Sequence, residues 1–236
     1  MSLSIPYIGP VRTPGGGVDM PVVYFNDFLA GGDFSETVNL ADFVASGAGT
    51  STFLQVDSAI GGQVALTNGG TDNDATDCQL NGEPFQVSST QDLVFECKFH
   101  VDNITLSDWW VGLSVTDTDT LSTPANFIGF GNSVNAADIY ANCGSTASGA
   151  FATGTAGTNE TLTDTGVNLV ASTFTTVRFE VIGNSKIRYY VDGVLKATHT
   201  TNIPTVTMTP TMVIRNASGA ARTMTVDWIL AYQDRD

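Results

Sequence analysis

The chain has 236 residues, of which 42% are hydrophobic and only 14% charged, and its formal net charge at pH 7 is −15. This charge argues against nucleic acid as a partner, because phosphate binding requires clustered Lys and Arg side chains. No apolar run approaches the roughly 20 residues of a membrane-spanning helix, so no membrane partner is expected.

Residues 1–22 are rich in proline and glycine, including the run Pro14-Gly15-Gly16-Gly17. Proline lacks the amide donor of a strand ladder, and consecutive glycines are entropically costly to order, so this composition predicts an extended arm. Its apolar side chains are expected to dock onto a neighbouring subunit of a homo-oligomer: Ile5, Tyr7, Ile8 and Val11. The alternative is a frayed terminus.

Residues 23–236 are expected to form a single all-β domain. Strand-like runs recur with turn residues between them, which is typical of an antiparallel sandwich or barrel. A helical turn is expected near Val38–Val44, and the Gly-, Ala-, Thr- and Ser-rich segment Asn142–Gly166 is expected to be a mobile or partner-ordered loop. The predicted strands are Val22–Phe28, Phe53–Val56, Gln63–Thr67, Asp77–Leu80, Leu93–Val101, Trp109–Thr116, Phe127–Gly131, Asp138–Ala141, Thr175–Ile182, Ser185–Val191, Val194–His199, Thr211–Arg215 and Thr223–Tyr232.

An acidic cluster precedes and enters the fourth of these strands. Asp72, Asp74 and Asp77, with Asn73 between them, offer the oxygen donors that calcium prefers. The spacing lacks the D-x-D-x-D-G order of a self-contained calcium loop, and short Asp/Asn runs commonly form turns by bonding their own backbone. A calcium site and a simple turn are both kept open, and no other cofactor is expected.

The pair Trp109-Trp110 is the sharpest local feature of the chain. Trp109 is in phase with apolar residues of its strand and is expected in the core, whereas Trp110 is in phase with Gly112 and Ser114. An outward indole can stack on a sugar ring or fill a subunit interface, so Trp110 is a candidate partner-binding residue. The alternative is that one of the chain's own loops covers it.

The last quarter of the chain, Val177–Tyr232, alternates apolar and polar residues around two tight turns. Gly183-Asn184 and Asp192-Gly193 separate three runs, which predicts consecutive β-hairpins. The closing run is expected to place Met224, Val226, Trp228 and Leu230 on one face and Thr225, Asp227, Ile229 and Ala231 on the other.

Four segments resemble the concanavalin A-like lectin/glucanase sandwich, a jelly-roll group that includes laminin-G-like domains. They are FEVIGNSKIRYYVDGV (179–194), MVIRNASGAARTMTVDWILAY (212–232), YFNDF (24–28) and LVFECKFHV (93–101). The resemblance implies an antiparallel β-sandwich over roughly Val22–Tyr232. It leaves function open, because this architecture hosts lectins, glycosidases, adhesion modules and viral structural proteins.

Retaining glucanases of this group carry an E-x-D-x-E strand, and the chain has no such triplet: neither Glu96 nor Glu180 has an acidic residue two positions away. A Ser-His-Asp triad has only His100 and His199 as possible bases, both expected on exposed strand positions, and no G-x-S-x-G elbow is present. The three cysteines, Cys78, Cys97 and Cys143, form no C-x-x-C pair, so no disulfide framework or zinc site is expected. We therefore expect a protein that is not an enzyme.

The style of the sequence resembles virion proteins of tailed bacteriophages, since it has few lysines, many small polar residues and a Pro/Gly-rich arm. The resemblance implies a capsid decoration or cement protein that binds the major capsid protein on the capsid exterior. The alternative is a lectin-like carbohydrate-binding module for host or glycan adhesion. A glycan is therefore a second possible partner.

Overall fold

The computed structural model describes residues 21–28, 43–47, 51–56, 59, 62–117, 121, 125–133, 136–148 and 154–234. Every regular element in these ranges is a β-strand. The first eight are β1 Val22–Asn26, β2 Phe43–Gly47, β3 Thr52–Gln55, β4 Val64–Thr67, β5 Ala75–Leu80, β6 Phe85–Gln86, β7 Leu93–Val101 and β8 Ser107–Ser114. The others are β9 Asn126–Asn132, β10 Asp138–Ser148, β11 Thr158–Asn168, β12 Thr175–Ile182, β13 Lys186–Val191, β14 Val194–His199, β15 Thr207–Asn216 and β16 Thr223–Gln233.

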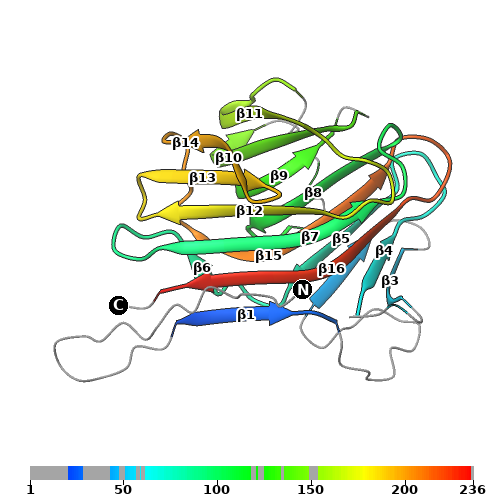
Figure 1. Cartoon of the computed structure of the whole chain (residues 1–236), viewed down its shortest axis with the longest axis horizontal. Helices are drawn as coiled ribbons and strands as arrows, with labels where there is room; N and C mark the ends of the chain where they lie inside the picture. Colours follow the sequence, from blue (N-terminus) through cyan, green and yellow to red (C-terminus); the bar gives the residue numbers. More distant parts are fainter. Residues whose placement is uncertain are drawn as a thin grey trace.

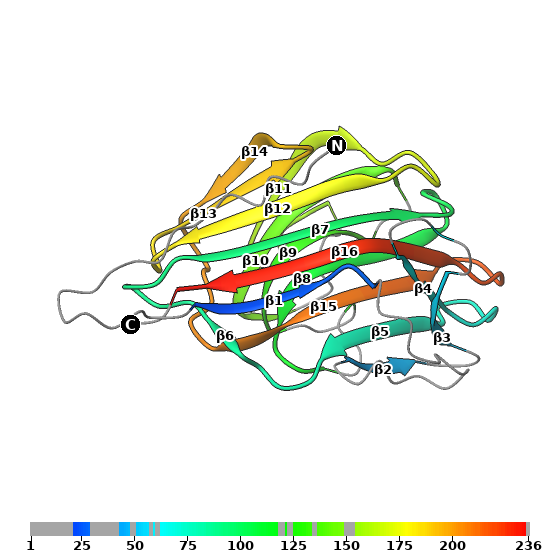
Figure 2. The same ribbon diagram turned by 60° about the horizontal axis from the view of Figure 1, so that its bottom comes forward.

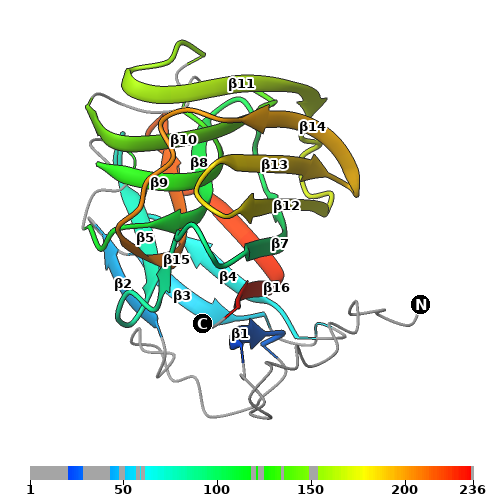
Figure 3. The same ribbon diagram turned by 90° about the vertical axis from the view of Figure 1, so that its left-hand side faces the viewer.

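The strands form two layers, which Figure 3 shows edge-on. Sheet I has the order β14-β13-β12-β7-β16-β4-β3, with β1 paired to β16, and faces the viewer in Figure 1. Sheet II has the order β11-β10-β9-β8-β15-β5-β2, with β6 paired to β15. All described strand pairs are antiparallel, so the predicted antiparallel β-sandwich is confirmed.

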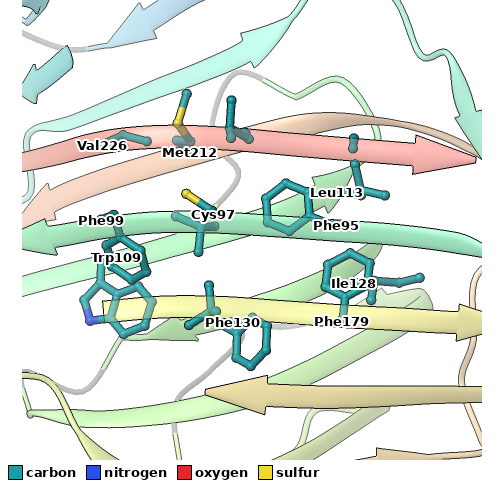
Figure 4. Packing of buried hydrophobic residues seen from close by; sticks show 14 of the residues in the cluster. Phe95, Cys97, Phe99, Trp109, Leu113, Ile128, Phe130, Phe179, Met212 and Val226 are labelled. Atoms are coloured by element: carbon teal, nitrogen blue, oxygen red, sulfur yellow. The ribbon is translucent and has the colours of Figure 1, made fainter. Parts of the chain in front are cut away.

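The core fills the space between the sheets, and aromatic rings make up much of it (Figure 4). Phe95 of β7 stacks on Phe179 of β12 at 5.2 Å between ring centroids, and Phe99 lies 5.0 Å from Trp109 of the opposite sheet. Full burial of one such phenylalanine contributes about 2–3 kcal/mol. Trp109 is therefore a core residue, as its strand phase predicted.

The predicted hairpins of the last quarter are present. Strands β12, β13 and β14 are consecutive antiparallel neighbours, and their turns use positive φ at Gly183, Asp192 and Gly193. A left-handed backbone at both central residues of Asp192-Gly193 matches the twist of the flanking strands, which is why this dipeptide can close a two-residue hairpin.

Two segments that were not expected to be strands contain strands. Residues 43–47 form β2, so Phe43 and Val44 are not in a helical turn; residues 38–42 lie outside the described ranges, and the helical turn expected near Val38–Val44 is untested there. The loop prediction for the second segment was wrong. The expected loop Asn142–Gly166 holds most of the long pair β10–β11. Threonine favours strands, and tertiary bonds support the pair, such as Tyr189 Oη donating to the carbonyl of Asn142 at 2.9 Å.

Two bulges reverse the side-chain phase that simple alternation predicted. In β16 an extra residue, Asp227, lies between Val226 and Trp228, so Ile229 is buried whereas Trp228 is half-exposed. The expected common face of Met224, Val226, Trp228 and Leu230 was therefore wrong. In β14 the register shifts opposite Tyr189 and Tyr190, and His199 is buried rather than exposed.

Of the candidate arm, residues 1–22, the first 20 residues lie outside the described ranges, and with them Ile5, Tyr7, Ile8 and Val11; Val22 is the first residue of β1. The predicted boundary between arm and domain thus stays a prediction. Within the described ranges no helix has the length and hydropathy of a membrane span.

Candidate functional site

The outer face of sheet II holds the residue that the sequence offered for partner binding. Cross-strand neighbours place Trp110 of β8 between Gly131 of β9 and Val213 of β15, with Tyr140 of β10 beyond the glycine. Trp110 is 0% exposed and forms a second small core with Leu121, Phe127 and Val213. The expectation of an outward, accessible indole was wrong, and the alternative of coverage by the chain itself is confirmed.

Glycines make this arrangement possible. A Cβ atom at Gly129 or Gly131 would lie 2.6 Å from the ring of Trp110, so the indole rests directly on the backbone of β9. Its Nε1 donates to Asn142 Oδ1 at 3.3 Å. The ring is thus held in a fixed position and serves packing in this conformation.

Beside Trp110, polar side chains form a hydrogen-bond network on the same outer face of sheet II. Gln79 Nε2 donates to Ser114 Oγ at 3.1 Å and to Thr211 Oγ1 at 3.0 Å, joining β5, β8 and β15. Its Oε1 accepts from the amide of Asp117 at 2.9 Å, and its Nε2 also reaches the carbonyl of Val115 at 3.1 Å. These bonds hold residues 115–117, which follow β8, against the sheet.

The outer face of sheet I is open by comparison. On β7, β12 and β13 the half-exposed positions alternate with buried ones and point away from the core. They carry a polar field, defined as Glu96, Lys98, Arg178, Glu180, Arg188 and Tyr190. These side chains are cross-strand neighbours, since Arg178 lies between Glu96 and Tyr190, and Glu180 lies opposite Arg188.

Charges in the polar field are largely compensated. Arg178 pairs with Glu180, whose Oε2 accepts from Tyr190 Oη at 2.9 Å. Lys98 Nζ lies 2.6 Å from Oδ2 of Asp227, the bulge residue of β16. Such partly exposed pairs contribute about 0–1 kcal/mol to stability, so their main effect is to fix the positions of donors and acceptors.

Aromatic side chains border the field. Trp228 of β16 is half-exposed and pairs in register with Lys98, which places it on the same outer face. Tyr190 stands on the other side, with the Arg178 guanidinium 5.7 Å from its ring centroid. Three inter-strand spacings and a shift of two residues along the strands separate the two rings, which corresponds to a distance of about 15 Å.

Glu96 and Tyr190 are the titratable groups of this field with displaced pKa values, and both pKa values are raised, first of all by desolvation on burial. For Glu96, Arg178 opposes the rise in pKa, and the nearby Glu180 carboxylate adds to it. Glu96 and Glu180 are thus two interacting carboxyl groups on neighbouring strands.

A cysteine and a histidine meet between the sheets where β10 approaches β14. Cys143 Sγ lies 3.4 Å from His199 Nδ1, and His199 Nε2 lies 3.0 Å from Thr163 Oγ1. Burial lowers the pKa of His199 to about 4 and raises that of the Cys143 thiol to about 12. Both groups are therefore neutral near pH 7, and the pair has no thiolate to act as a nucleophile.

The predicted calcium ligands do not converge. Asp74 Oδ2 accepts from the amide of Thr71 at 3.0 Å and so closes a turn, which was the alternative reading of this cluster. Asp77 lies buried in β5, while Asp72 is exposed. Among the described residues no three His, Cys, Asp or Glu side chains are grouped so that they could hold a metal ion. The structure gives the calcium prediction no support.

Comparison with known proteins finds similar folds at low sequence identity. No protein-family model and no curated protein matches the sequence. The chain resembles an endo-1,3-beta-glucanase from Streptomyces sioyaensis, with 16% identity, a TM-score of 0.61 and coverage of 95% of this chain and 99% of that chain. It also resembles a Bacillus licheniformis beta-glucanase, with 15% identity, a TM-score of 0.57 and coverage of 89% of this chain and 97% of that chain. A third similar structure is a protein of unknown function from Shewanella oneidensis MR-1, with 11% identity, a TM-score of 0.60 and coverage of 91% of this chain and 87% of that chain.

These similarities show that the fold is the jelly-roll sandwich of concanavalin A-like glucanases. Further similar structures include a lichenase, an alginate lyase and an endo-beta-1,4-glucuronan lyase. The expectation that the chain is not an enzyme is therefore overturned: glycoside hydrolases and polysaccharide lyases predominate among these neighbours, so the scaffold is one that enzymes use. The resemblance to bacteriophage virion proteins has no counterpart among them and stays a prediction.

The sequence reasoning did not identify the polar field. Its residues were visible as the polar half of the alternation in β7, β12 and β13, but their grouping depends on which strands are neighbours. The bulge at Asp227 also hid Trp228, which simple alternation placed with the core residues Met224 and Val226.

Proposed function

We propose that the protein binds a polysaccharide chain across the polar field of sheet I. One observation carries this proposal: two half-exposed aromatic side chains, Trp228 and Tyr190, stand on either side of paired charges whose positions are fixed. Sugar rings offer C–H faces that stack on aromatic rings, and hydroxyl groups that bond to carboxylates, guanidinium groups and ammonium groups. A span of about 15 Å accommodates several sugar units.

The overall charge favours a neutral polymer. With a net charge of −15, the protein repels a polyanion, and the polar field, with Lys98, Arg178 and Arg188 facing Glu96, Glu180 and Asp227, holds no large excess of positive charge to offset this. The similarity to an endo-1,3-beta-glucanase, a beta-glucanase and a beta-1,3-1,4-glucanase supports the same choice, because glucans are neutral polymers.

The test measures binding to a panel of soluble polysaccharides by affinity electrophoresis, using a β-1,3-glucan, a mixed-linkage β-glucan, an α-glucan and alginate. We expect retardation by a neutral glucan, and at least about tenfold weaker binding for Trp228→Ala and Tyr190→Ala, the loss typical of a removed aromatic anchor. Tyr140→Ala, which removes a half-buried aromatic side chain from the opposite sheet, is the matched control and should bind as the wild type does. Absence of binding to every polymer, or equal binding by all three variants, would contradict the proposal.

The same samples decide whether bound polymer is cleaved. Reducing ends report hydrolysis, and absorbance of an unsaturated product reports a lyase reaction. Glu96 and Glu180 are the carboxyl groups to substitute if cleavage is found, since an acid with a raised pKa beside a second carboxylate is the arrangement that glycoside hydrolysis uses.

The second candidate function is that of a capsid decoration protein of a tailed bacteriophage. It is favoured by two exposed apolar side chains on β1, Val23 and Phe25, which would serve as a contact surface for another protein. The major capsid protein as partner and a location on the capsid exterior belong to this candidate alone. Mixing the protein with undecorated capsids tests it, and failure to bind, with no change in capsid stability, would refute it.

A further inference from the structure

The chain contains two Asn-Gly dipeptides, Asn68-Gly69 and Asn81-Gly82, and the fold places them in opposite surroundings. Both residues of the first are buried. Asn68 Oδ1 accepts from the amide of Arg222 at 2.7 Å, and the carbonyl of Gly69 accepts from Asn216 Nδ2 at 2.7 Å. Both residues of the second dipeptide are exposed. The same chemical group is therefore enclosed at one position and open to solvent at the other.

The exposed dipeptide lies in the turn between β5 and β6, which leaves the arrowhead of β5 in Figure 2. Gly82 has a φ of 80°, and no atom beyond its chain neighbours lies within 4 Å of the position that a Cβ atom would take. Glycine changes its backbone conformation at low cost, and an exposed turn opens locally far more easily than a strand ladder. The backbone nitrogen of Gly82 can therefore reach the side chain that precedes it.

We propose that Asn81 is a site of spontaneous deamidation, and that its conversion loosens residues 115–117. Asparagine is among the thermally labile residues. The backbone nitrogen of Gly82 attacks Cγ of Asn81, so that a new C–N bond closes a five-membered succinimide ring. The bond from Cγ to the side-chain nitrogen breaks, and this nitrogen leaves as ammonia after taking up the proton that the backbone nitrogen gives up. Water then adds to either ring carbonyl and breaks its bond to the ring nitrogen, which leaves aspartate or isoaspartate at position 81.

The hydrogen bonds around Asn68 oppose the same reaction there. Its side chain accepts from the amide of Arg222, and its own amide donates to the carbonyl of Arg222 at 3.1 Å, so Asn68 is held twice by the segment before β16. Ring closure requires the side chain to rotate towards the nitrogen of Gly69, and for this the buried segment must first open. Asn68-Gly69 is therefore an internal control for the exposed dipeptide.

Glu83 connects the turn of Asn81 to residues 115–117. Its Oε1 accepts from the amide of Thr116 at 2.7 Å, and its Oε2 accepts from Thr207 Oγ1 at 2.7 Å. Deamidation places a second carboxylate two residues from Glu83, and isoaspartate also lengthens the backbone of the turn by one carbon atom. Both changes displace Glu83 from Thr116. Residues 115–117 then lose one of the bonds that hold them against sheet II.

The test is peptide mapping by mass spectrometry while the folded protein is incubated at mildly alkaline pH. We expect Asn81 to convert at least about tenfold faster than Asn68, because Asn68 reacts only after local opening of a buried segment. Hydrogen–deuterium exchange of the same samples should become faster at residues 115–117 as Asn81 converts. Asn81→Gln is the matched control, since its longer side chain has to close a larger ring, and this variant should keep slow exchange throughout the incubation.

Three results would overturn the inference. The first is conversion of Asn68 at the same rate as Asn81 or faster. The second is an Asn81 that stays intact in the folded protein and converts in urea, since this would show that the turn keeps its side chain away from Gly82. The third is unchanged exchange at residues 115–117 in fully converted protein. Because the turn belongs to sheet II, none of these results bears on polysaccharide binding at the polar field of sheet I.

Discussion

At the scale of single residues, the indole of Trp110 shows how a large side chain can be accommodated on a sheet. It is buried on the outer face of sheet II because β9 carries glycine where other strands carry side chains. The sequence displayed both features, an aromatic residue in outward phase and a strand that reads NFIGFGN. Their connection could not be predicted, since it requires knowing that β8 and β9 are neighbours in this register.

The glycine at position 131 should therefore be essential for stability. In Gly131→Ala the new methyl group would lie 2.6 Å from Cδ1 of Trp110, so we expect a loss of about 1–3 kcal/mol, as is usual for overpacking. Gly70→Ala is the matched control, because its Cβ would meet no atom closer than 3.9 Å. Urea unfolding measures both variants, and equal stability of the two would disprove the close packing.

Acid sensitivity should arise at His199. Its pKa is about 4 in the folded protein and about 6.5 in the unfolded chain, so folding favours the neutral imidazole. The stabilisation is complete above pH 6.5 and is lost as the pH falls towards 4, by up to about 3 kcal/mol. In His199→Gln this part of the pH dependence should disappear.

The control for this experiment is His100→Gln. Burial also lowers the pKa of His100, but this side chain is only half-buried, so the variant should keep most of the acid sensitivity. Urea unfolding at a series of pH values between 7 and 4 compares the proteins. An unchanged pH profile for His199→Gln would show that another group is responsible.

At the scale of elements, the bulges of β14 and β16 are the places where side-chain faces predicted from simple alternation are wrong. Strands with uninterrupted alternation, such as β7 and β12, were predicted with their correct faces. In β16 one extra residue exchanges the two faces halfway along the strand, and nothing in the local composition around Asp227 announces it. The consequence was greatest for the candidate site, because Trp228 and Leu230 lie beyond the bulge.

The hairpin β10–β11 has the composition of a loop and the hydrogen bonding of a strand pair. Hydrogen–deuterium exchange distinguishes the two, because ladder amides open only with the sheet. We expect the amides of residues 139–144 to exchange as slowly as those of β7, whereas the turn at 183–185 exchanges fast. If residues 139–144 exchange as fast as that turn, the segment is a loop, as its composition predicted, and the strand pairing is disproved.

At the scale of the whole molecule, the class of fold was accessible from the sequence, and the arrangement of its strands was not. Turn dipeptides and alternation are local signals, and they were sufficient to predict most strands and the antiparallel sandwich. The pairing of β7 joins residues 76–88 positions apart with β12 and 123–140 positions apart with β16, so the polar field that lies on these strands could only be found in the structure.

The negative charge of the protein is distributed unevenly between the outer face of sheet I and the rest of the surface. On the outer face of sheet I the cationic side chains of Lys98, Lys186, Arg178 and Arg188 are matched by the carboxylates of Glu96, Glu180, Asp227 and Asp234, while the chain as a whole is strongly acidic. The molecule should therefore adsorb to a cationic support by its remaining surface. Simple ion exchange would then immobilise it in one orientation, with sheet I turned towards the liquid and ready for sensing or capture.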